Sequence, residues 1–280
     1  MLKRFKALLP KRFRNVDVIV PVVRLSGTIS AGSGFRPTLN LAGIALALEK
    51  AFKMKDAPAV ALLVNSPGGA PVQSRFIYER VRALAAEKDK QVLVFVEDVA
   101  ASGGYMIALA GDEIFADATS VVGSIGVVAA GFGFVEMIEK IGVERRVYTS
   151  GENKVILDPF LPRKQTDVDH LLTLQEDIHE VFIDMVKERR GDLLSDDSDI
   201  FSGLFWTGRK ARDLGLIDGL GDLRSILKAK FGENAKPKLI AGDRGFPFRR
   251  GGQGVMRPSI SPADILSSLE ERATWARYGL

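Results

Sequence analysis

Short apolar runs alternate with longer amphipathic segments through the first part of the chain. Three runs are rich in β-branched side chains and bounded by Gly, Pro or Ser: VDVIVPVVRLSG, PAVALLVNS and QVLVFVE. Between them, residues 41–54 and the segment VQSRFIYERVRALAAE carry apolar residues at helical spacing, and Asn40 is placed to cap the first of these helices. The alternation predicts βαβ units around a mainly parallel sheet. Pro21 indicates an edge or bulged strand, because proline donates no ladder hydrogen bond.

The rest of the chain combines short strands with helices. Strands are predicted at EIFAD, VVGSIGVVA and ERRVYTSG. Helices are predicted at GFVEMIEKIG, over the long amphipathic segment KQTDVDHLLTLQEDIHEVFIDMVKERRG, and on both sides of a tight turn in FWTGRKARDLGLIDGLGDLRSILKAKFG. The whole pattern predicts an α/β fold with additional helices toward the C-terminus.

Composition divides the chain into three parts. Residues 1–15 form a basic amphipathic segment, residues 16–240 a single α/β domain, and residues 241–280 a Gly-, Pro- and Arg-rich arm with a short C-terminal helix. The arm is interpreted as a linker or a flexible segment. No internal repeat is found, so we expect the domain to occur once.

Charge is concentrated at the N-terminus. The formal net charge is +4, yet residues 1–14 hold six of the 39 basic residues and no acid, which leaves 39 − 6 = 33 bases against 35 acids in the body. This balance argues against a nucleic-acid-binding body, because no basic face is implied. The basic, apolar N-terminal segment is expected to lie on an anionic membrane surface, to be disordered, or to dock on the body.

No targeting or membrane-spanning segment is predicted. The N-terminal charges are not followed by the apolar stretch of a signal peptide, and no run of about 18 apolar residues occurs. We therefore expect a cytoplasmic protein, with peripheral contact at the inner membrane through residues 1–14 as the alternative. The absence of cysteine excludes disulfides and cysteine nucleophiles.

Two glycine turns follow predicted buried strands, NSPGG (Asn65 to Gly69) and ASGG (Ala101 to Gly104). In a parallel α/β sheet, the carboxyl ends of the strands form the reactive crevice. Backbone N–H groups of such turns can hold the oxyanion of a tetrahedral intermediate, and Ser102 would lie beside them. Each motif alone is also an ordinary structural signal, PGG of a turn and SGG of a helix cap.

A serine nucleophile needs a base. The two histidines, His170 and His179, are nine residues apart on one predicted helix and are interpreted as polar-face or partly packed residues, a poor pair of metal ligands. A lysine is the alternative base, provided that burial lowers its pKa from about 10.4. Composition does not identify that lysine.

The ordered motifs NSPGG, DVAASGGYMIALAGDEIFAD, GSIGVV and YTSGENKVILDPF resemble the signal peptide peptidase A family of Ser-Lys serine peptidases. The resemblance covers roughly Val18 to Phe231 and implies a fold like that of the crotonase and Clp-protease sheet. It also implies hydrolysis of hydrophobic peptides, such as remnant signal peptides, in homo-oligomeric rings without a cofactor or metal. Many family members begin with a spanning helix, which is not predicted here, so location and natural substrate stay open.

Site residues follow from the same resemblance. It implies that Ser102 is the nucleophile, that Lys154 is the base and that Ser124 orients the lysine. The oxyanion hole maps to the backbone of Gly68 and Gly69, with Gly103 opposite. An acyl-enzyme would form on the serine, and the lysine would then activate water.

Two other functions stay open. A crotonase-type acyl-thioester enzyme would use the same fold and two-amide hole, with a coenzyme A site and no role for Lys154. A non-catalytic scaffold associated with the membrane would use neither residue.

Overall fold

The computed structural model describes residues 17–31, 38–241 and 272–279, and within them eight strands form one sheet. The strands are β1 (Val18–Ser26), β2 (Ala59–Ser66), β3 (Gln91–Ala101), β4 (Glu113–Ala116), β5 (Val121–Gly123), β6 (Phe205–Thr207), β7 (Gly219–Leu220) and β8 (Ala235–Leu239). Their order is β6-β5-β3-β2-β1-β8, while β4 pairs with β3 and β7. Every pair is parallel except β5–β6. The predicted α/β fold with a mainly parallel sheet is therefore confirmed.

Strand β3 is long enough to pair with two successive strands along one of its sides. Its residues Leu93–Val96 pair with β4, and Val99–Ala101 pair with β5. The next residue is Ser102, which therefore lies where β2, β3 and β5 end together.

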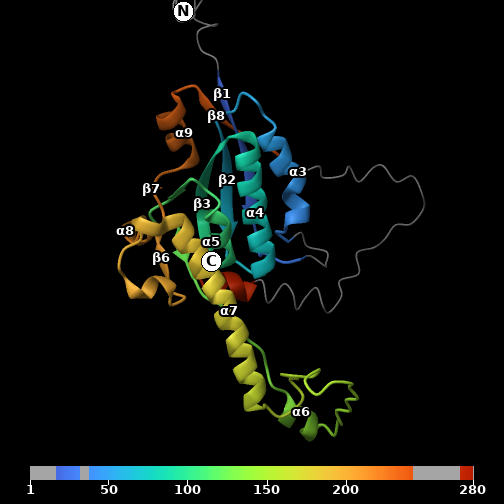
Figure 1. Ribbon diagram of the computed structural model, residues 1–280. Helices are drawn as coiled ribbons and strands as arrows, with labels where there is room; N and C mark the ends of the chain where they lie inside the picture. Colours follow the sequence, from blue (N-terminus) through green and yellow to red (C-terminus); the bar gives the residue numbers. More distant parts are fainter. Residues whose placement is uncertain (1–16, 32–37, 242–271, 280) are drawn as a thin grey trace, which may run out of the picture.

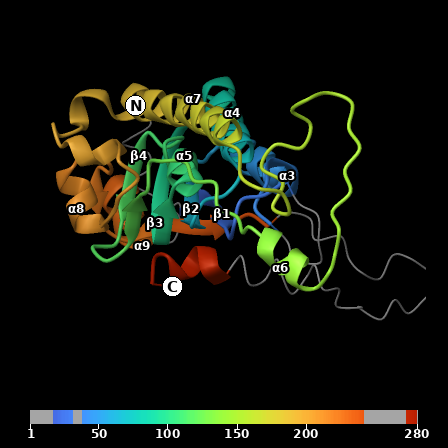
Figure 2. The same ribbon diagram turned by 90° about the horizontal axis from the view of Figure 1, so that it is seen from below.

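Helices cover both faces of the sheet, and their bounds are α3 (Leu41–Phe52), α4 (Pro71–Lys88), α5 (Gly103–Ala108), α6 (Val135–Lys140), α7 (Gln165–Arg190), α8 (Gly208–Asp213) and α9 (Leu223–Phe231). Figure 2 shows α3, α4, α5 and α7 on one face, with α9 and the C-terminal residues on the other. The larger core, which includes Leu48, Ile77 and Tyr105, lies under the first group, and a smaller core around Phe95 and Phe115 lies under α9.

Two local strand predictions are wrong. Strand β1 is interior, between β2 and β8, although it contains Pro21. Its register with β2 begins only at Val22, so the N–H that proline lacks interrupts no ladder on that side. The segment ERRVYTSG is irregular and pairs with no described strand, although its β-branched and aromatic residues favour strands.

Residues 128–163, here called the projecting segment, lie away from the rest of the described chain. They contain α6 and run beyond the N-terminal end of the long helix α7 (Figure 1). The expected N-terminal segment and most of the expected C-terminal arm lie outside the described residues. In the described part of the chain, no helix has the length and apolar character that crossing a membrane requires.

Candidate active site

Ser102 occupies a strained turn between β3 and α5. Its backbone has φ 51° and ψ −122°, a left-handed conformation that costs energy for a residue other than glycine. Its N–H donates to the carbonyl of Gly123 (2.8 Å), and its carbonyl accepts from Met106 (3.0 Å). Ser102 occupies the N-cap position of α5, as its place before two glycines and a helix predicted, but its side chain makes no helix-capping hydrogen bond.

The PGG turn lies directly against this serine. A Cβ on Gly68 would come within 2.9 Å of Ser102 Cβ and of the nitrogen of Gly103. A Cβ on Gly69, whose φ is 140°, would collide with the carbonyl of Ile29. Only glycine allows the two turns this close approach.

The N–H groups of the glycines differ in their partners. The N–H of Gly68 donates to the buried hydroxyl of Ser66 (3.2 Å), so it faces inward. The carbonyl of Gly68 accepts from the N–H of Ile29 (2.8 Å), and the N–H of Ala70 donates to the carbonyl of Ile29. This β-bridge between Ile29 and Gly69 does not use the N–H of Gly69. Among the described residues, the N–H groups of Gly69 and Gly103 have no protein partner. These two donors, one on each turn, are the pair available to an oxyanion.

A narrow apolar cavity adjoins the serine. Its volume is about 10 Å³, close to the space that one water molecule needs. It is lined by Gly69, Pro71, Ser102, Gly103, Met106, Gly126, Val127, Ile178 and Phe182. Its apolar walls come from α5, from α7 and from the chain that leaves β5.

Ser124 follows β5, next to the residue that binds the serine turn. It also has a positive φ, 55°, and its N–H donates to the carbonyl of Leu204 (2.7 Å). Its hydroxyl lies 3.3 Å from the hydroxyl of Tyr278. The sequence interpretation missed Tyr278, because no local pattern links residues so far apart in the chain.

His179 of α7 contacts the chain just after Ser124. Its Nε2 donates to the carbonyl of Ile125 (3.0 Å), the residue after Ser124. The prediction of a partly packed histidine is confirmed for His179, which is half-buried, whereas His170 is exposed. No group of metal-ligating side chains occurs in the described ranges 17–31, 38–241 and 272–279.

Lys154 does not lie at this site in the single chain. It belongs to the projecting segment, its side chain is exposed, and its N–H donates to Gly151 (3.3 Å) in a local turn. Figure 1 places that segment far from α5. The structure therefore brings together Ser102, Ser124 and the glycine turns, and leaves the predicted base apart from them.

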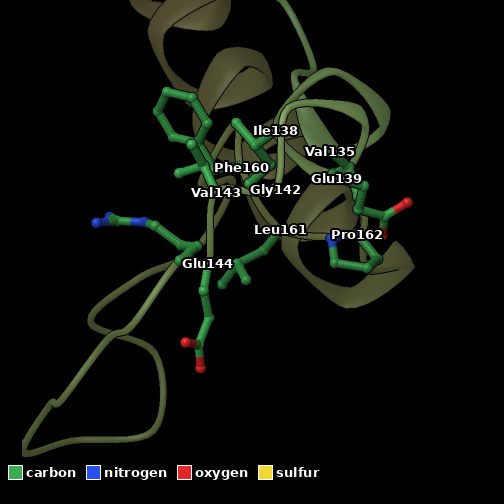
Figure 3. Close-up of a pocket in the computed structure, with 10 residues that line it drawn as sticks. Val135, Ile138, Glu139, Gly142, Val143, Glu144, Phe160, Leu161 and Pro162 are labelled. Atoms are coloured by element: carbon green, nitrogen blue, oxygen red, sulfur yellow. The ribbon is translucent and has the colours of Figure 1, made fainter.

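The projecting segment has a small core of its own. Phe134 stacks on Phe160 with ring centroids 5.5 Å apart, and Arg145 pairs with Asp158 at 2.8 Å. The N–H of Phe160 and the guanidinium of Arg145 hold the pKa of Asp158 below its usual range. Beside this core lies an apolar pocket of about 430 Å³ (Figure 3). The pocket is lined by Val135, Ile138, Glu139, Gly142, Val143, Glu144, Arg145, Phe160, Leu161 and Pro162.

Comparisons with known proteins point to one peptidase family. Residues 85–235 match the family described as Peptidase family S49. The chain is 30% identical over 260 residues to the chloroplastic serine protease SPPA of Arabidopsis thaliana, covering 89% of this chain and 36% of that protein. It is 32% identical over 221 residues to Protease 4 of Haemophilus influenzae, covering 78% of this chain and 36% of that protein.

Another relative carries a different name. The chain is 60% identical over 285 residues to a Brucella abortus protein named Na(+)/H(+) antiporter NhaA, covering 98% of this chain and 39% of that protein. The chain thus spans less than two fifths of the length of each of these three relatives.

Proposed function

Because this chain belongs to peptidase family S49, we propose that it is a serine endopeptidase with Ser102 as nucleophile and Lys154 as general base. One observation supports this function above all: the strained Ser102 turn lies against the PGG turn, with the N–H groups of Gly69 and Gly103 free of protein partners among the described residues. The proposed substrates are hydrophobic peptides, such as remnant signal peptides, because the cavity beside the serine is apolar.

The proposed chemistry is acyl transfer. The neutral amine of Lys154 removes the hydroxyl proton of Ser102 as the oxygen attacks a peptide carbonyl. The two N–H groups stabilise the oxyanion, the leaving amine takes the proton, and an acyl-enzyme remains. The amine of Lys154 then takes a proton from the water that attacks the ester, and it passes this proton to Ser102 Oγ as the acid product leaves.

The exposure of Lys154 bears on how the dyad forms. A lysine amine acts as a base only when it is neutral, and burial in an apolar setting favours the neutral form. Within one chain, Lys154 is exposed on a segment that lies far from α5, the helix that follows Ser102 (Figure 1). We therefore infer that each dyad joins Ser102 of one copy to Lys154 of a neighbour, in the ring that the family resemblance implies.

Two inactive variants test both parts of this proposal. Ser102→Ala and Lys154→Ala should each lower peptidase activity by at least about 10⁴-fold, with unchanged thermal unfolding for the exposed lysine. Mixed in equal amounts and reassembled, they should recover about a quarter of the wild-type rate, because random neighbours pair an intact serine with an intact lysine at about one site in four. Activity in either variant alone would contradict the dyad, and no recovery on mixing would contradict a dyad between copies.

The alternative functions give different results. A crotonase-type enzyme would keep its activity on acyl thioesters in Lys154→Ala. A scaffold would form no covalent adduct on Ser102 with a fluorophosphonate. As for the Brucella relative, we propose that the antiport in its name belongs to the part of that protein which this chain does not match.

A further inference from the structure

The C-terminal residues 272–279 lie at the carboxyl edge of the sheet, on the face opposite α5 (Figure 2). Tyr278 of this segment contacts the site. Its hydroxyl lies 3.3 Å from Ser124 Oγ and 3.4 Å from the carbonyl oxygen of Pro67. Its ring packs edge-on against Phe205 of β6, with centroids 5.0 Å apart. Three separate elements thus converge on one phenol.

The hydrogen bonds define what this site recognises. A phenol has one proton, which it can donate to the carbonyl of Pro67 while its oxygen accepts the proton of the Ser124 hydroxyl. The aromatic ring of Phe205 suits the edge of a second ring. Both oxygen–oxygen distances are long for hydrogen bonds of a hydroxyl, so the contact is weak and an occupant with a stronger interaction can displace it.

The same serine hydroxyl has a second predicted partner. Under the proposed function, Ser124 Oγ orients the amine of Lys154, which in the single chain is exposed on the projecting segment. Tyr278 offers a phenolic hydroxyl and no amine, so it cannot replace the lysine as the base. Because Tyr278 belongs to the same chain, it reaches Ser124 at a high effective concentration, whereas a lysine from another copy arrives only on assembly.

We propose that Ser124, Pro67 and Phe205 form a binding site for the phenol of Tyr278, and that this occupant keeps Lys154 away from Ser124 until copies of the chain assemble. The binding site stands on the contacts of Tyr278 alone, and the exclusion of Lys154 rests on the proposed function. An unassembled chain would then carry its nucleophile without a base beside it. Assembly would exchange the phenol for the amine of a neighbour.

The binding site can be tested without any peptidase assay, because the chain contains no cysteine. In Ser124→Cys, the single thiol should react with N-ethylmaleimide roughly three- to tenfold faster once Tyr278→Ala is added, since one aromatic contact and one weak hydrogen bond are lost. Tyr278→Phe should give an intermediate rate. Arg277→Ala, an exposed neighbour on the same segment, is the matched control and should leave the rate unchanged. Equal thiol rates with and without Tyr278 would overturn the binding site.

The exclusion of Lys154 needs a second measurement, which is fluorophosphonate labelling of Ser102 at several protein concentrations. At protein concentrations where wild type is only partly assembled, Tyr278→Ala should be labelled several-fold faster, because losing the competing phenol shifts assembly to lower concentrations. The difference should vanish where both are fully assembled or both are dissociated. Faster thiol modification without faster labelling would overturn the exclusion alone. No labelling of wild type or variant at any concentration would instead overturn the proposed function and the exclusion with it, and the thiol rates would still decide the binding site.

Discussion

The sheet edge around Ser102 and the projecting segment that carries Lys154 differ most clearly at their glycines. At the sheet edge, an added Cβ on Gly69, Gly103 or Gly104 would collide with neighbouring atoms. On the projecting segment, Gly133 and Gly142 have no atom within 4 Å of the same position. The glycines of the sheet edge are therefore tightly packed, whereas Gly133 and Gly142 of the projecting segment face open space.

Apolar side chains give the same contrast. The core residues nearest the serine, such as Tyr105 and Ile107, are fully buried. On the projecting segment, Phe132 is 82% exposed and Ile141 is 65% exposed. The proposed nucleophile and the candidate oxyanion donors are thus held in place by the fold of one chain, whereas the proposed base lies on an exposed surface. Under the proposed function, only the base depends on assembly.

The largest expected effect concerns the glycines. Gly69→Ala should lower the peptidase rate by about 10²–10³-fold, because the Cβ would force a candidate oxyanion donor out of position, and should cost about 3 kcal/mol of stability. Gly133→Ala should leave the rate unchanged and the free energy of unfolding unchanged or raised by up to about 1 kcal/mol. Enzyme assays and denaturant unfolding of both variants check this. Similar stability losses in both would remove the distinction between the two regions.

Ion pairs should show a contrast in stability alone, with no direct effect on the peptidase rate. Arg190 is 5% exposed and binds Asp218 (3.0 Å) and the carbonyl of Gly215, so Arg190→Met should cost about 3–5 kcal/mol by leaving a half-buried carboxylate without its partner. Arg146→Met, which breaks an exposed pair on the projecting segment, should change stability by less than about 0.5 kcal/mol. Urea unfolding of the two variants measures the difference. A cost above about 2 kcal/mol for Arg146→Met would show that its surface is already buried in a single copy.

The smallest expected effect is the response of the projecting segment to acid. The folded-state pKa of Asp158 lies below its ordinary 3.8, so the stabilisation from the N–H of Phe160 and the guanidinium of Arg145 is present above that value and is lost as pH falls through the lowered one. Amide hydrogen exchange at residues 157–161, corrected for intrinsic rates, should therefore rise about two- to fivefold below that lowered pKa, while core strands stay protected. Asp158→Asn should abolish this dependence, and Glu144→Gln should preserve it. An unchanged response in Asp158→Asn would place its origin in another group.

The strand–turn–helix units of the sheet edge were predictable because their signals are local. Strand β3, Ser102 and α5 follow from an apolar run, two glycines and a second apolar run. Asn40 was likewise identified as a helix cap, and its side chain does accept from Gly43 (2.9 Å). Each of these signals lies within a few residues of the feature it determines.

Features that depend on distant neighbours were not predictable. The inward N–H of Gly68 depends on the position of Ser66 in the folded turn, and the contact of Tyr278 with Ser124 joins residues 154 positions apart. Strand β8 was missed because AKPKL is short, contains two lysines and a proline, and lacks β-branched residues. The family resemblance implied that Lys154 is the base, but nothing in its local sequence indicated that it would lie far from the serine in the single chain.

The pairing of β5 with β6 affects the order in which a chain emerging from the ribosome completes its reactive edge. The carbonyl of Gly123 accepts from the N–H of Ser102, and the N–H of Ser124 donates to the carbonyl of Leu204. Leu204, just before β6, is synthesised about a hundred residues after the serine. Because folding during synthesis proceeds from the N-terminal side, a nascent chain carries the serine long before that support exists. Translation therefore finishes this edge late, and a truncated product that ends before residue 204 lacks the strand that closes it.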